Sequence, residues 1–471
     1  MTAPVIYWTR RDFRLSDNPA LAAAAASGAP VIAVFICDEV VETHGAAPKW
    51  RLGLGAAAFG ERLASVGSGL IFRRGTAAEV LQALVAETGA GAVHWNRLYD
   101  PASRKRDQGV KAALKDRGIE AVSHAGHVVH EPWTVQTGTG GFYKVYTPFW
   151  NTVRGRDVAE PLAIPTLTAP ATWPDSDAIG DWQLGAAMNR GAEVVLAHCH
   201  IGEQAARDRL DSFVADKVAG YGEARDQMAI DGTSGLSENL TYGEISARTC
   251  WHAGRRAMEE GKPGAETFLK ELIWRDFAYH LVFHTPHIVT RSWREEWEAF
   301  AWNADDTVPE VQAWLRGRTG MQIVDAALRE MYVTGRMHNR ARMLVASYLT
   351  KHLLSHWKIG MDWFEECLVD WDPASNAMGW QWSAGSGPDA TPYFRVFNPE
   401  TQAEKFDKDG RYRRRWLAEI TNRPTDTALS YFRAIPRSWD MQPAGPYPAA
   451  PVVSASDGRQ RALAAYETRN F

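Results

Sequence analysis

The chain has 471 residues, of which 45% are hydrophobic and 23% are charged, and its formal net charge at pH 7 is −4. The length allows two or three domains of ordinary size, and the composition is that of a soluble globular protein. The slightly negative charge excludes a general electrostatic attraction to nucleic acid, so any DNA contact has to come from local basic patches.

No segment of the sequence predicts export or membrane insertion. The N-terminus lacks a basic start followed by a long apolar run, and no stretch reaches the roughly 18 to 20 apolar residues of a membrane span. The four cysteines are scattered, which argues against a disulfide framework. Adjacent side chains of His198-Cys199-His200 diverge on a regular backbone, so we expect no metal site there. We expect a cytoplasmic protein without membrane contact.

Short apolar runs alternate with helical segments over residues 1–130. Strands that alternate with helices predict a parallel sheet with right-handed crossovers, so we expect a Rossmann-like α/β domain. No Gly-x-Gly-x-x-Gly follows the first apolar run, so the dinucleotide fingerprint is absent. The predicted strands are 5–8, 31–36, 70–72 and 92–95, and the clearest helices are 18–26 and 76–87.

The rest of the chain divides into two further parts. Over residues 131–200 the periodicity weakens and prolines lie among Thr, Ala and Asp, which predicts an interdomain connector. Over residues 201–471 apolar residues recur at three- and four-residue spacing, which predicts an all-helical domain. The clearest helices there are 203–218, 265–282, 320–332, 341–356 and 361–368.

Two predicted helices carry unusual faces. Glu271, Trp274 and Arg275 lie three and four residues apart and share one face, where they form either a ligand-binding group or an exposed ion pair beside an isolated indole. Asn339 and Met343 lie one turn apart among arginines. They form either a binding surface or a cationic turn in which Met fills the core, as Met commonly does.

A hydroxyl-rich loop and the tryptophans add two more signals. Thr233-Ser234-Gly235-Leu236-Ser237 precedes a helical stretch, so it can bind a phosphate or simply cap the helix. The chain has 20 Trp, and residues 376–382 place an amide one turn before an indole. Indole rings stack on flat ligands and can also pass electrons, and both uses fit a flavoprotein that acts on DNA.

The order and spacing of these motifs resemble the photolyase/cryptochrome family over essentially the whole chain. The resemblance implies an N-terminal α/β antenna domain and a C-terminal helical domain that holds FAD in a U shape. It rests on WTRRDFRL (8–15), GTSGLS (232–237), FLKELIWRDF (268–277), TGMQIVDA (319–326), MHNR (337–340) and MGWQW (378–382).

The family's functional positions can be carried over residue by residue. Arg342 and Asp370 match the pair near the isoalloxazine ring, and Asn376 matches the residue that faces its N5 atom. Gly235 departs from the family, which often has Arg there. The full FAD set implied is Tyr221, Thr233, Ser234, Leu236, Ser237, Arg275, Arg342, Asp370, Asp372 and Asn376.

Four further groups follow from the same resemblance. Ungapped counting places Ala304 at the end of the electron path, and a two-residue insertion places Trp302 there. The implied lesion pocket consists of Glu271, Trp274, Asn339, Met343 and Trp382, and the implied contacts to the DNA backbone are Arg225, Arg340 and Arg395. The implied electron path consists of Trp380, Trp357 and Trp302. The resemblance also implies a methenyltetrahydrofolate (MTHF) antenna near Asn96 and Asp100.

Particular residues indicate the branch of the family. Plant cryptochromes carry Asp where this chain has Asn376, and six-four photolyases place a His pair where it has Asn339 and Met343. The segment RLYDP (97–101) resembles bacterial class III cyclobutane pyrimidine dimer photolyases. We therefore predict light-driven repair of pyrimidine dimers in DNA by a monomer. A cryptochrome-like photoreceptor without repair is the alternative, and a nucleotide-binding α/β domain on a helical scaffold is a third hypothesis.

Overall fold

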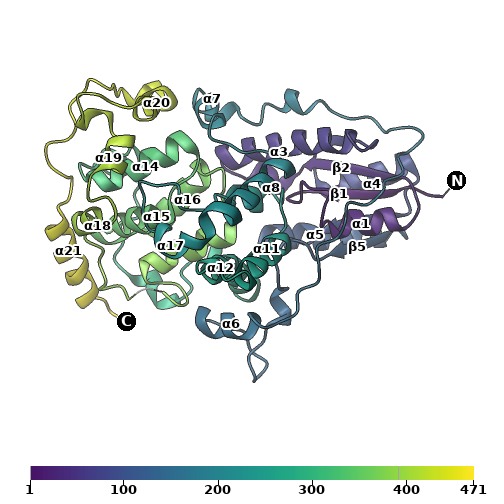
Figure 1. Cartoon of the computed structure of the whole chain (residues 1–471), viewed down its shortest axis with the longest axis horizontal. Coiled ribbons are helices and arrows are strands. Elements are labelled where there is room, and N and C mark those ends of the chain that lie inside the picture. The colour runs from purple at the N-terminus through teal and green to yellow at the C-terminus, as the bar shows by residue number, and fades with distance from the viewer. Residues whose placement is uncertain (1, 391) are drawn as a thin grey trace.

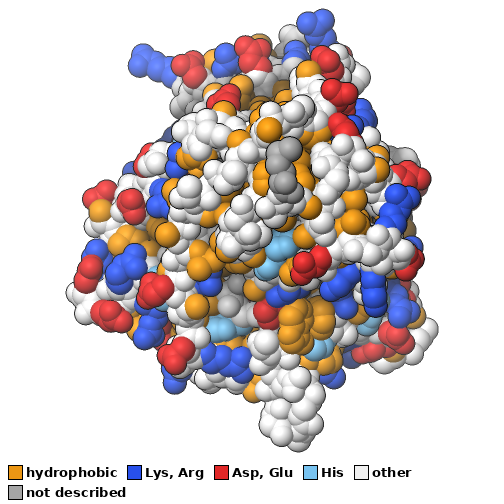
Figure 2. All heavy atoms as spheres, turned by 90° about the vertical axis from the view of Figure 1, so that its right-hand side faces the viewer, with side chains coloured by type: hydrophobic (Ala, Val, Ile, Leu, Met, Phe, Trp, Pro, Cys, Tyr) orange, Lys and Arg blue, Asp and Glu red, His pale blue; other side chains and the backbone are white. Residues whose placement is uncertain are grey.

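The structure is a computed structural model that describes residues 2–390 and 392–471. A sheet flanked by helices forms one end of the molecule, and a helical part forms the other (Figure 1). The face at the sheet end intersperses Lys and Arg with Asp and Glu (Figure 2). This face therefore offers no single-sign field to a nucleic acid. No helix among the described residues is both long and apolar enough to cross a bilayer.

Five parallel strands form one sheet, in the order β3-β2-β1-β4-β5. Every residue of β1 and β2 is buried, as central strands covered on both faces require. The register aligns Val5 of β1 with Val31 of β2 and with Ala92 of β4. The strands are β1 (Val5–Thr9), β2 (Val31–Cys37), β3 (Leu70–Arg74), β4 (Ala92–Asn96) and β5 (Glu120–His124).

Alternate residues of the strands build two cores, one on each face of the sheet. Tyr7 and Phe35 pack on the face covered by α1 (Pro19–Ala26) and α3 (Ala46–Ala64). Trp8 lies on the other face, which α4 (Ala77–Thr88) and α5 (Pro101–Lys115) cover. The predicted parallel α/β fold is therefore confirmed. The sequence did not predict β5, because this edge strand has no fully buried residue.

The segment 131–200 does more than link two domains. Its helix α6 (Tyr146–Val153) packs in one core with α11 (Ala247–Glu259) and α12 (Ala265–His284). Farther along, Thr168 accepts a backbone hydrogen bond from Val31 at 2.9 Å, next to the sheet. The segment thus packs on both parts of the molecule.

In the helical part, α17 (Pro373–Ala384) packs against α12, α15 (Asn339–Ser347) and α16 (Trp357–Cys367). The bounds of the other helices are α2 (Glu39–Glu42), α7 (Gly191–Leu196), α8 (Glu203–Ser212), α9 (Tyr221–Ala224), α10 (Ser237–Thr241), α13 (Pro309–Leu315), α14 (Gln322–Thr334), α18 (Pro399–Phe406), α19 (Arg411–Trp416), α20 (Asp426–Ala434) and α21 (Ala455–Glu467). Of these, α14, α18, α19, α20 and α21 lie in the same part of the molecule, towards the C-terminal end of the chain (Figure 1), whereas α2 contacts α5 and β2 in the sheet part.

The single helix predicted over 341–356 is wrong. The helix α15 ends at Ser347, a π-helical turn follows, and Leu354 has a left-handed φ of +49°. A new helix, α16, starts directly afterwards because the ring Nδ1 of His356 accepts the N–H of Lys358 at 3.1 Å and caps it. The predicted helix 361–368 therefore begins four residues earlier.

Candidate functional site

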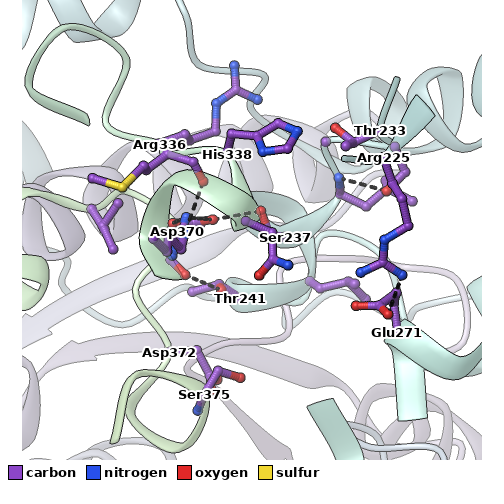
Figure 3. Close-up of a pocket in the computed structure, with 18 of the residues that line it drawn as sticks. Arg225, Thr233, Ser237, Thr241, Glu271, Arg336, His338, Asp370, Asp372 and Ser375 are labelled. Atoms are coloured by element: carbon purple, nitrogen blue, oxygen red, sulfur yellow. Dashed lines mark hydrogen bonds and ion pairs between the residues drawn. The ribbon is translucent and has the colours of Figure 1, made fainter. Parts of the chain in front are cut away.

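The helical part holds an open cavity of about 1180 Å³ (Figure 3). This volume exceeds that of a typical small-molecule site, roughly 300–1,000 Å³, and suits a dinucleotide-sized ligand with room for a second molecule. Seventeen residues predicted from the sequence line it: Tyr221, Arg225, Thr233, Ser234, Leu236, Ser237, Glu271, Trp274, Arg275, Asn339, Arg342, Met343, Asp370, Asp372, Asn376, Trp380 and Trp382.

The hydroxyl-rich loop forms one wall of the cavity. Its last residue, Ser237, starts α10 and donates to Asp370 Oδ2 at 2.7 Å. Gly235 has a φ of +63°, and a Cβ there would lie 3.3 Å from the guanidinium carbon of Arg209. Arg209 also lines the cavity and donates to the Gly235 carbonyl at 2.5 Å. No local motif points to Arg209, because it lies 26 residues before Gly235 in the chain.

A carboxylate–guanidinium pair stands beside this loop. Arg342 Nη2 donates to both oxygens of Asp370, at 2.9 and 2.8 Å. The Asp370 side chain is 4% exposed and that of Arg342 is 29% exposed. Thr241 Oγ1 donates to the Asp370 backbone carbonyl at 3.1 Å, so the pair is fixed to α10 as well as to α15 (Figure 3). The cavity thus has a pre-oriented pair of opposite charges in its wall.

The helix α17 places the amide and two indoles. Asp372 caps it by accepting the N–H of Ser375 at 2.8 Å. Asn376 Nδ2 donates to the Met361 carbonyl at 3.0 Å, which leaves Oδ1 as an acceptor for a ligand. Trp380 lies so close to Gly360 that a Cβ there would fall 1.9 Å from the indole, so glycine is required at that position.

On α12, the shared face predicted from the sequence borders the cavity. Glu271 is ion-paired with Arg225, and both side chains are partly exposed. Trp274 stacks face to face on Tyr146, with ring centroids 3.7 Å apart. Arg275 donates to the His127 carbonyl at 2.6 Å and so joins α12 to the loop after β5.

The start of α15 completes the rim. Asn339 is exposed, and Arg340 is paired with Asp226 at 2.8 Å while its Nη1 lies 4.0 Å from the sulfur of Met343. His338 also lines the cavity. It belongs to the motif MHNR but was not predicted as a site residue. Burial lowers the pKa of His338 to about 4, so the ring is neutral at pH 7 and caps α15 through Nδ1.

Several predicted residues lie outside the cavity. Trp357 and Trp302 are both buried, and the ring of His356 is near each of them, with centroid distances of 5.3 Å to Trp357 and 5.5 Å to Trp302. Arg395 is exposed, and its backbone carbonyl accepts a hydrogen bond from the buried Lys351 at 3.0 Å. Trp302 and Trp357 therefore contact the same imidazole ring, and the assignment of Trp302 to the electron path stays a prediction.

A second cavity of about 320 Å³ lies where the carboxyl ends of the strands meet the helical part. Asp100 lines this cavity and caps α5 by accepting the N–H of Ser103 at 2.9 Å. Asn96 lines neither cavity, because it is 4% exposed and its amide bonds to Asp12, Asn18 and Ala20. The hydrogen bonds of the Asn96 side chain therefore connect the end of β4 to the segment that follows β1.

The described residues contain no group of three His, Cys, Asp or Glu side chains that could hold a metal ion. In the His198–His200 segment, the His200 ring instead bonds to Arg209, with 2.8 Å between Nδ1 and Nη2. This contact ties the segment to the wall of the larger cavity.

The sequence of this chain matches two protein-family models and several known proteins. The family model "DNA photolyase" matches residues 5–168, and "FAD binding domain of DNA photolyase" matches residues 268–468. A deoxyribodipyrimidine photo-lyase of Agrobacterium fabrum is 43% identical over 99% of this chain and 98% of its own length.

The chain belongs to the DNA photolyase family.

Two solved structures of the family have the same fold over the whole chain. A bacterial class III photolyase from Agrobacterium tumefaciens has a TM-score of 0.90 at 42% identity, covering 99% of this chain and 98% of that one. A Synechocystis cryptochrome has a TM-score of 0.84 at 26% identity, covering 98% and 99%. The FAD-binding domain of this photolyase-family chain supplies α12, α15 and α17 of the larger cavity.

Proposed function

We propose that this protein is a deoxyribodipyrimidine photolyase that uses light and reduced FAD to split cyclobutane pyrimidine dimers in DNA. One observation carries the proposal: a single cavity joins the FAD-type wall of Asp370 and Asn376 to the carboxylate and indoles of Glu271, Trp274 and Trp382. The Agrobacterium relatives, named as a photo-lyase and as a class III photolyase, support it.

The residues of the cavity fit FAD. Hydroxyls and backbone N–H groups of the loop 233–237 suit a diphosphate, and Arg342 with Asp370 suits the polar edge of a flavin ring. Asn376 Oδ1 is left free to accept a hydrogen bond, as the N5–H of a reduced flavin offers. When bound, reduced FAD supplies the electron for ring splitting, and the protein supplies position and electrostatics.

Replacing Asn376 by aspartate is expected to change which flavin redox state accumulates under continuous light. A carboxylate adds negative charge beside a reduced anionic ring and disfavours that state, whereas the amide adds none. The absorption spectrum of the illuminated holoprotein in the presence of a thiol measures this change. An unchanged spectrum would show that Asn376 does not face the ring.

The DNA contacts proposed are Arg225, Arg340 and Arg395. Arg225 and Arg340 are paired with carboxylates at the rim, so each exchanges a carboxylate for a phosphate when DNA binds. Each such contact steepens the salt dependence of binding. A dimer stacks poorly, so extruding it costs only a few kcal/mol. Stacking on Trp274 and Trp382 offsets that cost by about 1–3 kcal/mol per base.

The electron path proposed runs from the cavity through Trp380, Trp357 and Trp302. Trp380 lines the cavity, and the other two rings are linked by His356. Replacing Trp380 by phenylalanine is expected to slow light-driven reduction of the oxidised holoprotein on the order of tenfold or more, because the indole is the ring of this path at the cavity. Repair by chemically reduced protein should remain, and its equal loss would argue against this role.

The antenna proposed is MTHF in the smaller cavity beside Asp100. The strand order reverses between β1 and β4, and ligands of open α/β sheets bind at such a switch point. Several residues of that cavity follow β1 and β4 directly, which supports the assignment. Asn96 is left out of this site because its amide is fully hydrogen-bonded inside the domain.

Light-dependent repair of an oligonucleotide that contains one dimer tests the proposal. The purified, reduced holoprotein should restore the ultraviolet absorbance of the intact pyrimidines only under blue or near-ultraviolet light. Absence of repair with reduced FAD bound would favour the alternative, a cryptochrome-like photoreceptor without repair activity.

A further inference from the structure

One contact at the lesion side of the cavity comes from outside the helical domain that the sequence predicts. Tyr146, the first residue of α6, lies flat on Trp274, with ring centroids 3.7 Å apart and an interplanar angle of 7°. Tyr146 is 7% exposed and does not line the cavity, whereas Trp274 does. One face of the indole is therefore covered by protein, and the surface left free borders the cavity.

Tyr146 is itself fixed from three directions. Its hydroxyl donates to the Lys270 carbonyl at 2.6 Å, one turn before Trp274 on the same helix. Its backbone N–H donates to Asp389 Oδ2 at 3.0 Å, and Phe277 packs edge-on against its ring at 5.8 Å. A ring held at both ends and on its edge cannot rotate freely, so it passes its orientation on to the indole stacked on it.

A tryptophan at the edge of a cavity can adopt several rotamers, and choosing one on binding costs free energy. By stacking on the indole, the Tyr146 ring restricts Trp274 to one rotamer in the DNA-free protein. Asp389 belongs to the segment that follows α17 and leads towards the exposed Arg395. The same tyrosine thus contacts the lesion wall and a segment at the proposed DNA surface.

We propose that Tyr146 is a positioning residue for dimer recognition: it holds the plane of Trp274 so that the open face of the indole receives the flipped pyrimidine. The inference rests on the proposed function and assigns a recognition role to the segment 131–200. We expect the main effect of Tyr146 to fall on the binding of damaged DNA, because its stacking partner is Trp274, an indole of the proposed lesion pocket.

Two substitutions separate the ring from the hydroxyl. Tyr146→Leu removes the stack, and Tyr146→Phe keeps it while removing the bond to the Lys270 carbonyl. Since an aromatic pair contributes about 0.5–1.5 kcal/mol beyond its buried area, Tyr146→Leu should weaken binding of a dimer-containing oligonucleotide about two- to twelvefold. Tyr146→Phe should stay within about twofold of wild type, which is the rescue expected of a stacking role.

The measurement is equilibrium binding in the dark, at fixed salt, of two oligonucleotides that differ only in the dimer. Affinity for the undamaged oligonucleotide and the FAD-to-protein ratio should be unchanged in both variants. Phe149→Leu is the matched control, because Phe149 lies on the same helix and packs against Phe277 but does not stack on Trp274.

Three results would overturn the inference. They are an equal loss of affinity for both oligonucleotides in Tyr146→Leu, the same selective loss in Phe149→Leu, or a selective loss in Tyr146→Phe as large as in Tyr146→Leu. Failure of the proposed function gives a different pattern, because wild-type protein would then bind the two oligonucleotides equally.

Discussion

Asp370→Ala is expected to lower the affinity for FAD about 10- to 100-fold, because hydrogen bonds between charged groups contribute about 1.5–3 kcal/mol. Asp370 accepts hydrogen bonds from Arg342 and from Ser237, and all three residues line the cavity proposed to hold the flavin. Without it, the guanidinium loses its partner and the serine hydroxyl loses its acceptor. Titration of the FAD-free protein with FAD, followed by flavin fluorescence, measures the change.

The control for this prediction is an ion pair of similar burial away from the cavity. Asp407, whose side chain is 1% exposed, pairs with Arg413 at 3.0 Å. Asp407→Ala should lower the midpoint of thermal unfolding while FAD affinity is retained. In the double variant Asp370→Leu with Arg342→Met, the loss of FAD affinity should be smaller than the sum of the single losses, because neither charge is left unpaired. Full retention of FAD by Asp370→Ala would contradict the assigned site.

Glu271→Ala is expected to lower the repair yield per absorbed photon about 10- to 100-fold while FAD binding stays intact, since one hydrogen bond to a charged group is lost. Glu271 borders the cavity between Arg225 and Trp274 and is the carboxylate proposed to bind the pyrimidine edge. Repair under calibrated light and the FAD-to-protein ratio are measured on the same preparation.

A second carboxylate on α12 serves as the control for Glu271. Glu266 pairs with Lys270 at 3.3 Å on the exposed side of the helix, so Glu266→Ala should leave repair unchanged. Glu271→Gln keeps hydrogen-bonding groups but removes the charge, and should fall between wild type and Glu271→Ala. Equal loss of repair and of FAD in Glu271→Ala would mean that the residue supports the cofactor instead.

Much of the fold followed from periodicity. Fully buried runs marked β1 and β2, because central parallel strands are apolar on both faces. The edge strand β5 was not predicted because it is only half-buried. The break in the helix at Leu354 was not predicted because a leucine with a left-handed backbone conformation has no sequence signature. Local sequence patterns therefore predict which residues are buried, but they do not predict backbone conformations that are imposed by contacts distant in the sequence.

The residues of the candidate site also fall into those that the sequence could predict and those that it could not. Residues within long motifs, such as Asn376 and Trp380, could be predicted, and the structure gathers them at one cavity. Tyr146 and Arg209 could not, because each reaches the site through a contact between segments far apart in sequence. The place of Trp302 depends on an insertion that spacing alone leaves open, so its part in the electron path stays a prediction, although its ring contacts that of His356.

The central claim is that reduced FAD and the dimer occupy neighbouring parts of one cavity. The fluorescence lifetime of the reduced holoprotein, measured with and without DNA, tests it most directly. A saturating dimer-containing oligonucleotide should shorten the lifetime, and the undamaged oligonucleotide should not, because only an electron acceptor in contact with the flavin quenches its excited state. An unchanged lifetime with the dimer bound would contradict the account.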